Sequence, residues 1–180
     1  YSPLRDAEDA LRWAEHAVDA SKQGGTLRHQ VESALALAWA CILKGDASRA
    51  RLSLETAEQA ARKAGIEIRL MALGFGGLAT VPSTVSIFLG EWNKAEAELV
   101  QMLEDSEQTH RPNMKQLWAN PAIGWLSLEK GDLAGAKERA GPLNIAGNAW
   151  RHVAREVIGT AAYQGGDLQA ARDTFTEIQQ

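Results

Sequence analysis

Apolar residues recur along most of the chain at intervals of three and four positions, the spacing that places them on one face of an α-helix. One such series is Ala50, Leu54, Ala57, Ala61 and Ala64. No segment shows a competing strand pattern. The sequence therefore predicts an all-α protein of about nine helices. Their expected ranges are about 3–23, 27–44, 47–64, 66–89, 92–108, 113–130, 133–141, 148–165 and 168–180.

A short motif separates these apolar stretches in pairs. It consists of Gly, an acidic residue, three variable residues and Ala, and it occurs at 45–50, 90–95, 131–136 and 166–171. Glycine ends a helix in the left-handed conformation at little steric cost, and aspartate then caps the next helix by accepting backbone N–H bonds. Alanine is small enough for two helices to approach closely. The motif predicts the tight turn of a helical hairpin.

Helical hairpins of this kind cannot bury their apolar faces alone, so we expect them to stack into one α-solenoid domain spanning 1–180. Residues 3–23 form the second helix of a hairpin whose first helix is missing. Two prolines disturb the pattern, Pro82 within 66–89 and Pro121 within 113–130. Because proline breaks or kinks a helix interior, we expect a kink or a short break near each of them.

Charge and composition exclude several function classes. The formal net charge is −4, so nothing favours direct binding of nucleic acid, which needs a basic face. No stretch has the about 18 apolar residues of a membrane span. Cys41 lies within an apolar helical pattern and is interpreted as a buried, inert thiol. We expect a cytoplasmic protein, and the start at Tyr1 indicates a piece of a longer chain.

No motif in the sequence indicates catalysis. The four histidines have no partner at a spacing used by metal sites, and neither a nucleophile elbow nor an HExxH motif occurs. The glycine-rich segment 74–77 lacks both the preceding strand and the following GK[ST] of a phosphate-binding loop. We therefore expect neither an enzyme nor a bound cofactor.

Two stretches carry the motif of a known repeat family. Ile123-Gly124 precedes the turn at 131–136, and Ile158-Gly159 precedes the turn at 166–171 and Phe175. These residues resemble the tetratricopeptide (TPR) consensus of a leucine-glycine pair, a turn glycine-aspartate, an alanine and an aromatic. The resemblance implies a right-handed superhelix whose first helices line a concave groove. The turn glycines are 45, 41 and 35 residues apart, whereas the usual TPR repeat has about 34 residues.

The long repeat steps resemble the arrays of large bacterial MalT-like and LuxR-type regulators, in which the array senses an inducer or docks partner domains. Segment 147–156 resembles the C-terminal part of YfgM-like TPR proteins, which are membrane-anchored ancillary subunits near the secretion translocon. The first resemblance implies a protein-protein interaction scaffold within a larger bacterial regulator, which holds a partner peptide or helix in its groove. Two alternatives remain open: a small-molecule sensor with a pocket near 74–88, and a periplasmic subunit anchored through a missing N-terminal segment.

The TPR resemblance also selects candidate residues for the groove. Carried over position by position, these candidates are Glu32, Leu35, Trp39, Thr80, Thr84, Trp118, Trp125, Glu129, Glu156, Thr160 and Tyr163. Aromatic side chains are common binding hot spots. In the competing interpretation, Trp39 and Trp125 are core wedges between helices. Trp13 and Trp150 are interpreted as packing residues. Arg151, His152 and Arg155 are interpreted as a surface group. The alternative is that these three residues bind the acidic end of a peptide.

Overall fold

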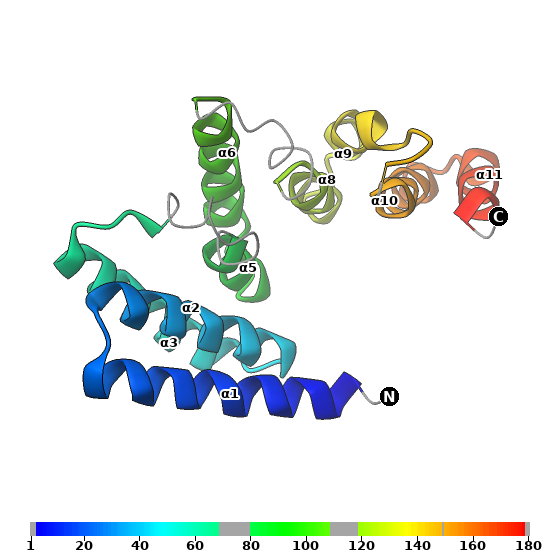
Figure 1. Cartoon of the computed structure of the whole chain (residues 1–180). Coiled ribbons are helices and arrows are strands. Elements are labelled where there is room, and N and C mark those ends of the chain that lie inside the picture. Colours follow the sequence, from blue (N-terminus) through cyan, green and yellow to red (C-terminus); the bar gives the residue numbers. More distant parts are fainter. Residues whose placement is uncertain (1–2, 69–79, 109–118, 149, 179–180) are drawn as a thin grey trace. The chain divides into compact units, whose positions relative to one another are not determined.

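The computed structural model describes residues 3–68, 80–108, 119–148 and 150–178 (Figure 1). Within these ranges the regular structure is entirely helical, with nine α-helices and one 3-10 helix. The α-helices are α1 (Pro3–Gly24), α2 (Leu27–Leu43), α3 (Ala47–Ala64), α5 (Val81–Phe88), α6 (Trp92–Gln108), α8 (Asn120–Glu129), α9 (Leu133–Ala140), α10 (Arg151–Gln164) and α11 (Leu168–Ile178), and the 3-10 helix is η3 (Gly141–Leu143). The all-α prediction is confirmed.

Seven of the described helices begin and end within three residues of the predicted bounds, and two differ more. Helix α5 begins at Val81 and helix α8 at Asn120, so Pro82 and Pro121 lie in first turns. A proline fits the first turn because its missing N–H has no acceptor within the helix there. Residues 66 and 67 are not helical, so the expected helix 66–89 is wrong at its start. The parts 69–79 and 113–118 lie outside the described residues.

The four predicted turns have the same backbone geometry. The turn glycines Gly45, Gly90, Gly131 and Gly166 have φ angles of 76°, 72°, 78° and 82°. In each turn the N–H of the following acidic residue donates to a carbonyl five positions back, as from Asp132 to Ser127 at 2.8 Å. Asp46, Asp132 and Asp167 each accept a backbone N–H three residues on, at 2.9–3.0 Å. The motif is thus both a helix stop and a helix start.

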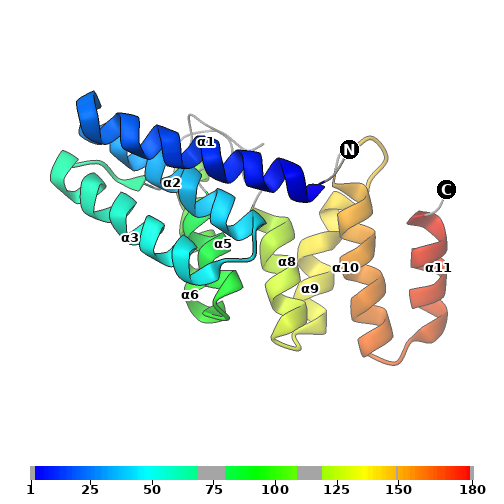
Figure 2. The same cartoon turned by 90° about the horizontal axis from the view of Figure 1, so that it is seen from below.

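The chain consists of two compact units, Tyr1–Ala95 and Glu96–Gln180. In the first unit, helix α2 contacts α1, α3 and α5, and Figure 2 shows α1, α2 and α3 side by side. Val31, Leu35 and Ala38 of α2 pack with Leu54 of α3 and Val85 of α5, all at most 3% exposed. Helix α2 is therefore the centre of this core.

The second unit has a core of its own. Helix α8 contacts α9 and α10, and α10 contacts α9 and α11. The four helices lie side by side in Figure 2. The buried alanines of α9 and α10 let these helices approach closely, and Leu128, Leu143 and Val157 fill the space between the elements. Trp150 packs against the same core, which confirms its interpretation as a packing residue.

The same ion pair occurs once in each unit. Lys44, just before Gly45, pairs with Glu8 of α1, and Lys130, just before Gly131, pairs with Glu96 of α6. Each lysine ends the first helix of a hairpin, and each glutamate lies on the helix before that hairpin. The two ion pairs thus occupy equivalent positions in the two hairpins.

Candidate partner-binding surface

Four helices end at the repeated turn, namely α2, α5, α8 and α10, and each presents two equivalent positions to solvent. The position six residues before the turn glycine is occupied by Trp39, Thr84, Trp125 and Thr160, and the position two residues before it by Leu43, Phe88, Glu129 and Gln164. Positions four residues apart lie on the same face of a helix. We call these eight residues the first-helix face, and treat each unit's part of it separately.

The two tryptophans of the first-helix face are open to solvent. Trp39 is 38% exposed and Trp125 is 46% exposed. Thr84 and Thr160, at the equivalent positions, are partly exposed. Because core wedges would be enclosed by neighbouring helices, the interpretation of Trp39 and Trp125 as wedges is wrong. Both side chains are available to a partner.

In the first unit the first-helix face is largely apolar. Leu43 is 50% exposed and Phe88 is 51% exposed, and the helices that carry them, α2 and α5, are in contact. Trp39 lies one turn before Leu43 on α2. The hydroxyl of Thr84 donates to the carbonyl of Thr80 at 2.6 Å. Exposed apolar side chains on neighbouring helices are typical of interaction sites.

Three further candidates of the first unit lie beside or beneath this face. Glu32 accepts a hydrogen bond from Nε of Arg28 at 2.9 Å, so its charge is already partnered. Leu35 is 1% exposed and Thr80 is 8% exposed. The choice of Leu35 and Thr80 as groove residues is wrong, because Leu35 packs in the core around α2 and Thr80 is enclosed at the start of α5.

In the second unit the first-helix face carries a tryptophan and a carboxylate, Trp125 and Glu129 of α8. The candidates Glu156 and Tyr163 lie on α10 with Thr160 but outside the eight residues of this face. Both carboxylates are exposed, and within the described part of the chain neither forms an ion pair. Tyr163 is 64% exposed. The candidate Trp118 lies outside the described residues, as do residues 74–79 of the proposed small-molecule pocket.

Sequence reasoning missed Leu43 and Phe88. The signal that could have found them is their register, since each follows a selected residue, Trp39 or Thr84, by four positions. Neither residue was recognised as a candidate, because an apolar residue just before a turn glycine is normally buried, as Ile42 is at 5% exposure. The structure instead turns Leu43 and Phe88 outward.

Two other interpretations need correction. Trp13 is 67% exposed, so it is not a packing residue; its ring lies 6.1 Å from that of His16.

Arg155 is buried and does not belong to a surface group with Arg151 and His152. Its Nε donates to Oδ1 of Asn144 at 3.0 Å, and its guanidinium pairs with Glu177 at 2.8 Å. These contacts hold η3, α10 and α11 together.

The described residues also bear on metal binding and membrane insertion. Among them, no three His, Cys, Asp or Glu side chains are grouped so that they could hold a metal ion. Nor does any helix in these ranges combine the length and the apolar character that crossing a bilayer requires. Cys41 is 1% exposed, as expected, and burial raises the pKa of its thiol.

Comparison with known proteins gives no assignment. No family model matches the chain, and no curated protein or solved structure is significantly similar to it. The function is therefore inferred from the surface that the helices present.

Proposed function

We propose that this protein is a TPR-like binding module that holds a peptide or helix of a partner protein on its first-helix face. The observation that carries the proposal is the exposure of Trp39 and Trp125 at the same register of two hairpins. Exposed tryptophans in a repeated position are well suited to anchor a partner, because tryptophan contributes more than most residues to protein interfaces.

The chemistry of the face indicates what kind of segment binds. The first unit offers Trp39, Leu43 and Phe88, which favour apolar side chains. The second unit offers Trp125 with the unpaired carboxylates Glu129 and Glu156, which favour lysine or arginine near an aromatic ring. Each unit is therefore expected to bind its own kind of segment, apolar in the first unit and basic in the second, and an amphipathic helix binds through side chains at helical spacing.

A selection from a displayed peptide library, followed by calorimetry, tests the proposal. The immobilised chain is used to select peptides, and their affinities are measured for the wild type, Trp39→Ala and Trp125→Ala. We expect at least about tenfold weaker binding for a tryptophan variant, since truncation of a binding hot spot costs about 2 kcal/mol or more. Leu43→Ser and Phe88→Ser extend the test with side chains that are half exposed and tolerate replacement.

Trp13→Ala is the matched control. Trp13 is a more exposed tryptophan of the first unit, but it lies on α1, which carries none of the residues of the first-helix face. We expect it to leave affinity unchanged. The proposal is lost if selected peptides bind all of these variants as tightly as the wild type, or if Trp13→Ala weakens binding as much as Trp39→Ala does.

A further inference from the structure

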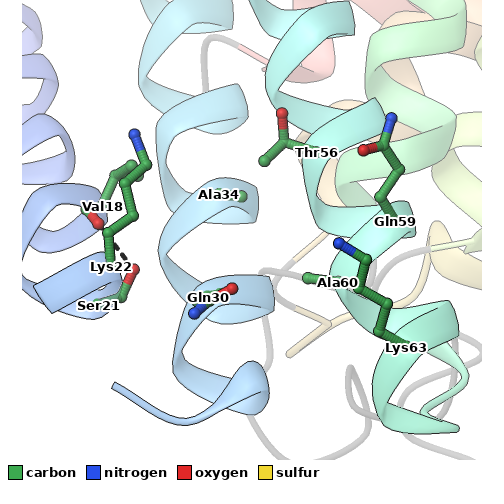
Figure 3. A pocket seen from close by; sticks show the side chains of 9 residues that line it. All are labelled: Val18, Ser21, Lys22, Gln30, Ala34, Thr56, Gln59, Ala60 and Lys63. Atoms are coloured by element: carbon green, nitrogen blue, oxygen red, sulfur yellow. Dashed lines mark hydrogen bonds between the residues drawn. The ribbon is translucent and has the colours of Figure 1, made fainter. Parts of the chain in front are cut away.

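Helices α1, α2 and α3 enclose a cleft with a volume of about 120 Å³ (Figure 3). Ala34 and Gln30 of α2 form its floor, and α1 and α3 form its walls. Gln30 and Trp39 are nine residues apart, which places them about 180° apart around α2. The cleft is therefore on the opposite side of α2 from the first-helix face, and a separate function must be sought for it.

The polar side chains of the cleft are cationic or neutral. Lys22 of α1 and Lys63 of α3 line it, together with the amides of Gln30 and Gln59, and no carboxylate does. Within the described part of the chain, neither lysine forms an ion pair and neither glutamine side chain forms a hydrogen bond. Lys22, Lys63 and Gln59 are exposed and Gln30 is partly exposed, so two positive charges line the same open cleft without an ion-pair partner, in a chain whose net charge is −4.

A structural role explains the two lysines only in part. Lys22 and Lys63 lie in the last turns of α1 and α3, where a cation interacts favourably with the helix dipole. Arg62 meets the same requirement in the last turn of α3, but its guanidinium lies 3.8 Å from Glu58. The dipole does not explain why the lysines line the same hollow as two amides with unused N–H donors.

We propose that this cleft binds a small oxyanion, namely a phosphate group or the carboxylate of a small acid. Lys22 and Lys63 supply the charge, and the amide groups of Gln30 and Gln59 donate directed hydrogen bonds. Thr56 also lines the cleft, but its hydroxyl already donates to the carbonyl of Leu52 at 2.9 Å. The cleft is small and open to solvent, which suits a single oxyanion group.

Titration of the full chain with inorganic phosphate, followed by amide chemical shifts, tests this inference. Ionic strength is held constant with sodium chloride, and a parallel titration with succinate distinguishes phosphate from carboxylate ligands. We expect saturable shifts at residues around the cleft for at least one probe. For the double variant Lys22→Gln/Lys63→Gln we expect at least about tenfold weaker binding, since charged hydrogen bonds are among the strongest.

Arg12→Gln/Arg62→Gln is the matched control, because it removes the same charge from the same two helices outside the cleft. It should bind the probe as the wild type does. Gln59→Glu, which keeps the size of the side chain and adds a carboxylate to the cleft one helical turn from Lys63, should abolish binding. Equal weakening by the two double variants would show diffuse charge attraction and overturn the inference. It would also be overturned if neither probe gave saturable shifts, or if Gln59→Glu bound normally.

Discussion

Gly159 of α10 lies against the ring of Phe175 of α11, so closely that a Cβ on the glycine would be 2.8 Å from Cε1 of the ring. The helices α10 and α11 contact each other along this line. The absence of a side chain at residue 159 is what lets the aromatic ring pack there. These two residues are also those that carry the TPR resemblance in the last hairpin.

We therefore expect Gly159→Ala to destabilise the protein by about 1–3 kcal/mol, the usual cost of overpacking. The change is measured as the free energy of unfolding in urea. Phe175→Leu should remove most of the penalty of the alanine, so that the two substitutions are strongly coupled in a double-mutant cycle.

Gly124→Ala is the control, since Gly124 is the equivalent residue of the preceding hairpin. A Cβ there would be 3.6 Å from Cβ of Arg139 and from Cγ1 of Val157, which is ordinary contact. Because alanine favours the helix by about 0.5–1 kcal/mol over glycine, this variant should be as stable as the wild type or more so. Similar losses at residues 124 and 159 would contradict the packing argument.

The contrast between the two glycines shows which features of the structure can be predicted from the sequence and which cannot. The turns were predictable, because left-handed glycines and aspartate caps are local features that four copies of one motif repeat. Which way a residue near a turn faces was less predictable. Ile42 and Leu128, three residues before their turn glycines, are each 5% exposed, whereas Tyr163 at the same register is 64% exposed. Register alone does not determine which neighbouring helix covers a side chain.

Long-range contacts explain the other errors. Leu35 has the register of a groove residue, but helices α3 and α5 meet around it and form the core. Arg155 has the sequence surroundings of a surface cation, but its acceptors come from residues 11 and 22 positions away. Single-sequence reasoning could not bring those segments together. The cleft between α1, α2 and α3 was missed for the same reason.

The thiol of Cys41 should be inert in the folded protein. Burial raises its pKa from the ordinary value of 9.0, and only the thiolate reacts with disulfide reagents. We expect no reaction with an aromatic disulfide at pH 8 in native buffer and one thiol reacting in denaturant. Ser48→Cys, which adds an exposed thiol on α3, is the control and should react at once. Rapid reaction of the wild type would show that α2 opens readily.

The ion pair between Arg51 of α3 and Glu91 should make a small, pH-dependent contribution to stability. The hydrogen bond from Arg51 lowers the pKa of Glu91 below its ordinary value of 4.5. A lowered folded-state pKa means stabilisation that is present above the unfolded pKa and is lost as the pH falls through the folded value. We expect Glu91→Gln to be less stable than the wild type at pH 7, with the difference vanishing in acid.

Urea unfolding at a series of pH values measures this difference. Glu138→Gln is the control, because Glu138 is exposed on α9 and has no ion pair in the described part of the chain. Its stability should follow that of the wild type at every pH. A difference for Glu91→Gln that persisted unchanged below the folded pKa would show that the charge of Glu91 is not what stabilises the protein.

Arg155 should be the most sensitive charged residue of the second unit. Its guanidinium bonds Asn144 of the segment after η3 and both the carbonyl and the carboxylate of Glu177 on α11. Arg155→Met leaves these acceptors without their donor, and we expect a loss of about 2–4 kcal/mol in the free energy of unfolding. Arg155→Lys should restore little, because an ammonium lacks the planar fork that reaches separate acceptors.

Glu177→Gln separates the two parts of this arrangement. The Glu177 side chain is 54% exposed, so losing its charge should cost at most about 1 kcal/mol, as for other solvent-exposed ion pairs. Its carbonyl still accepts from Arg155 in this variant. If Glu177→Gln lowered the free energy of unfolding as much as Arg155→Met does, the ion pair would be the source of the stabilisation. A small loss for both would show that α11 is held by Phe175 against Gly159, and that the buried guanidinium contributes little.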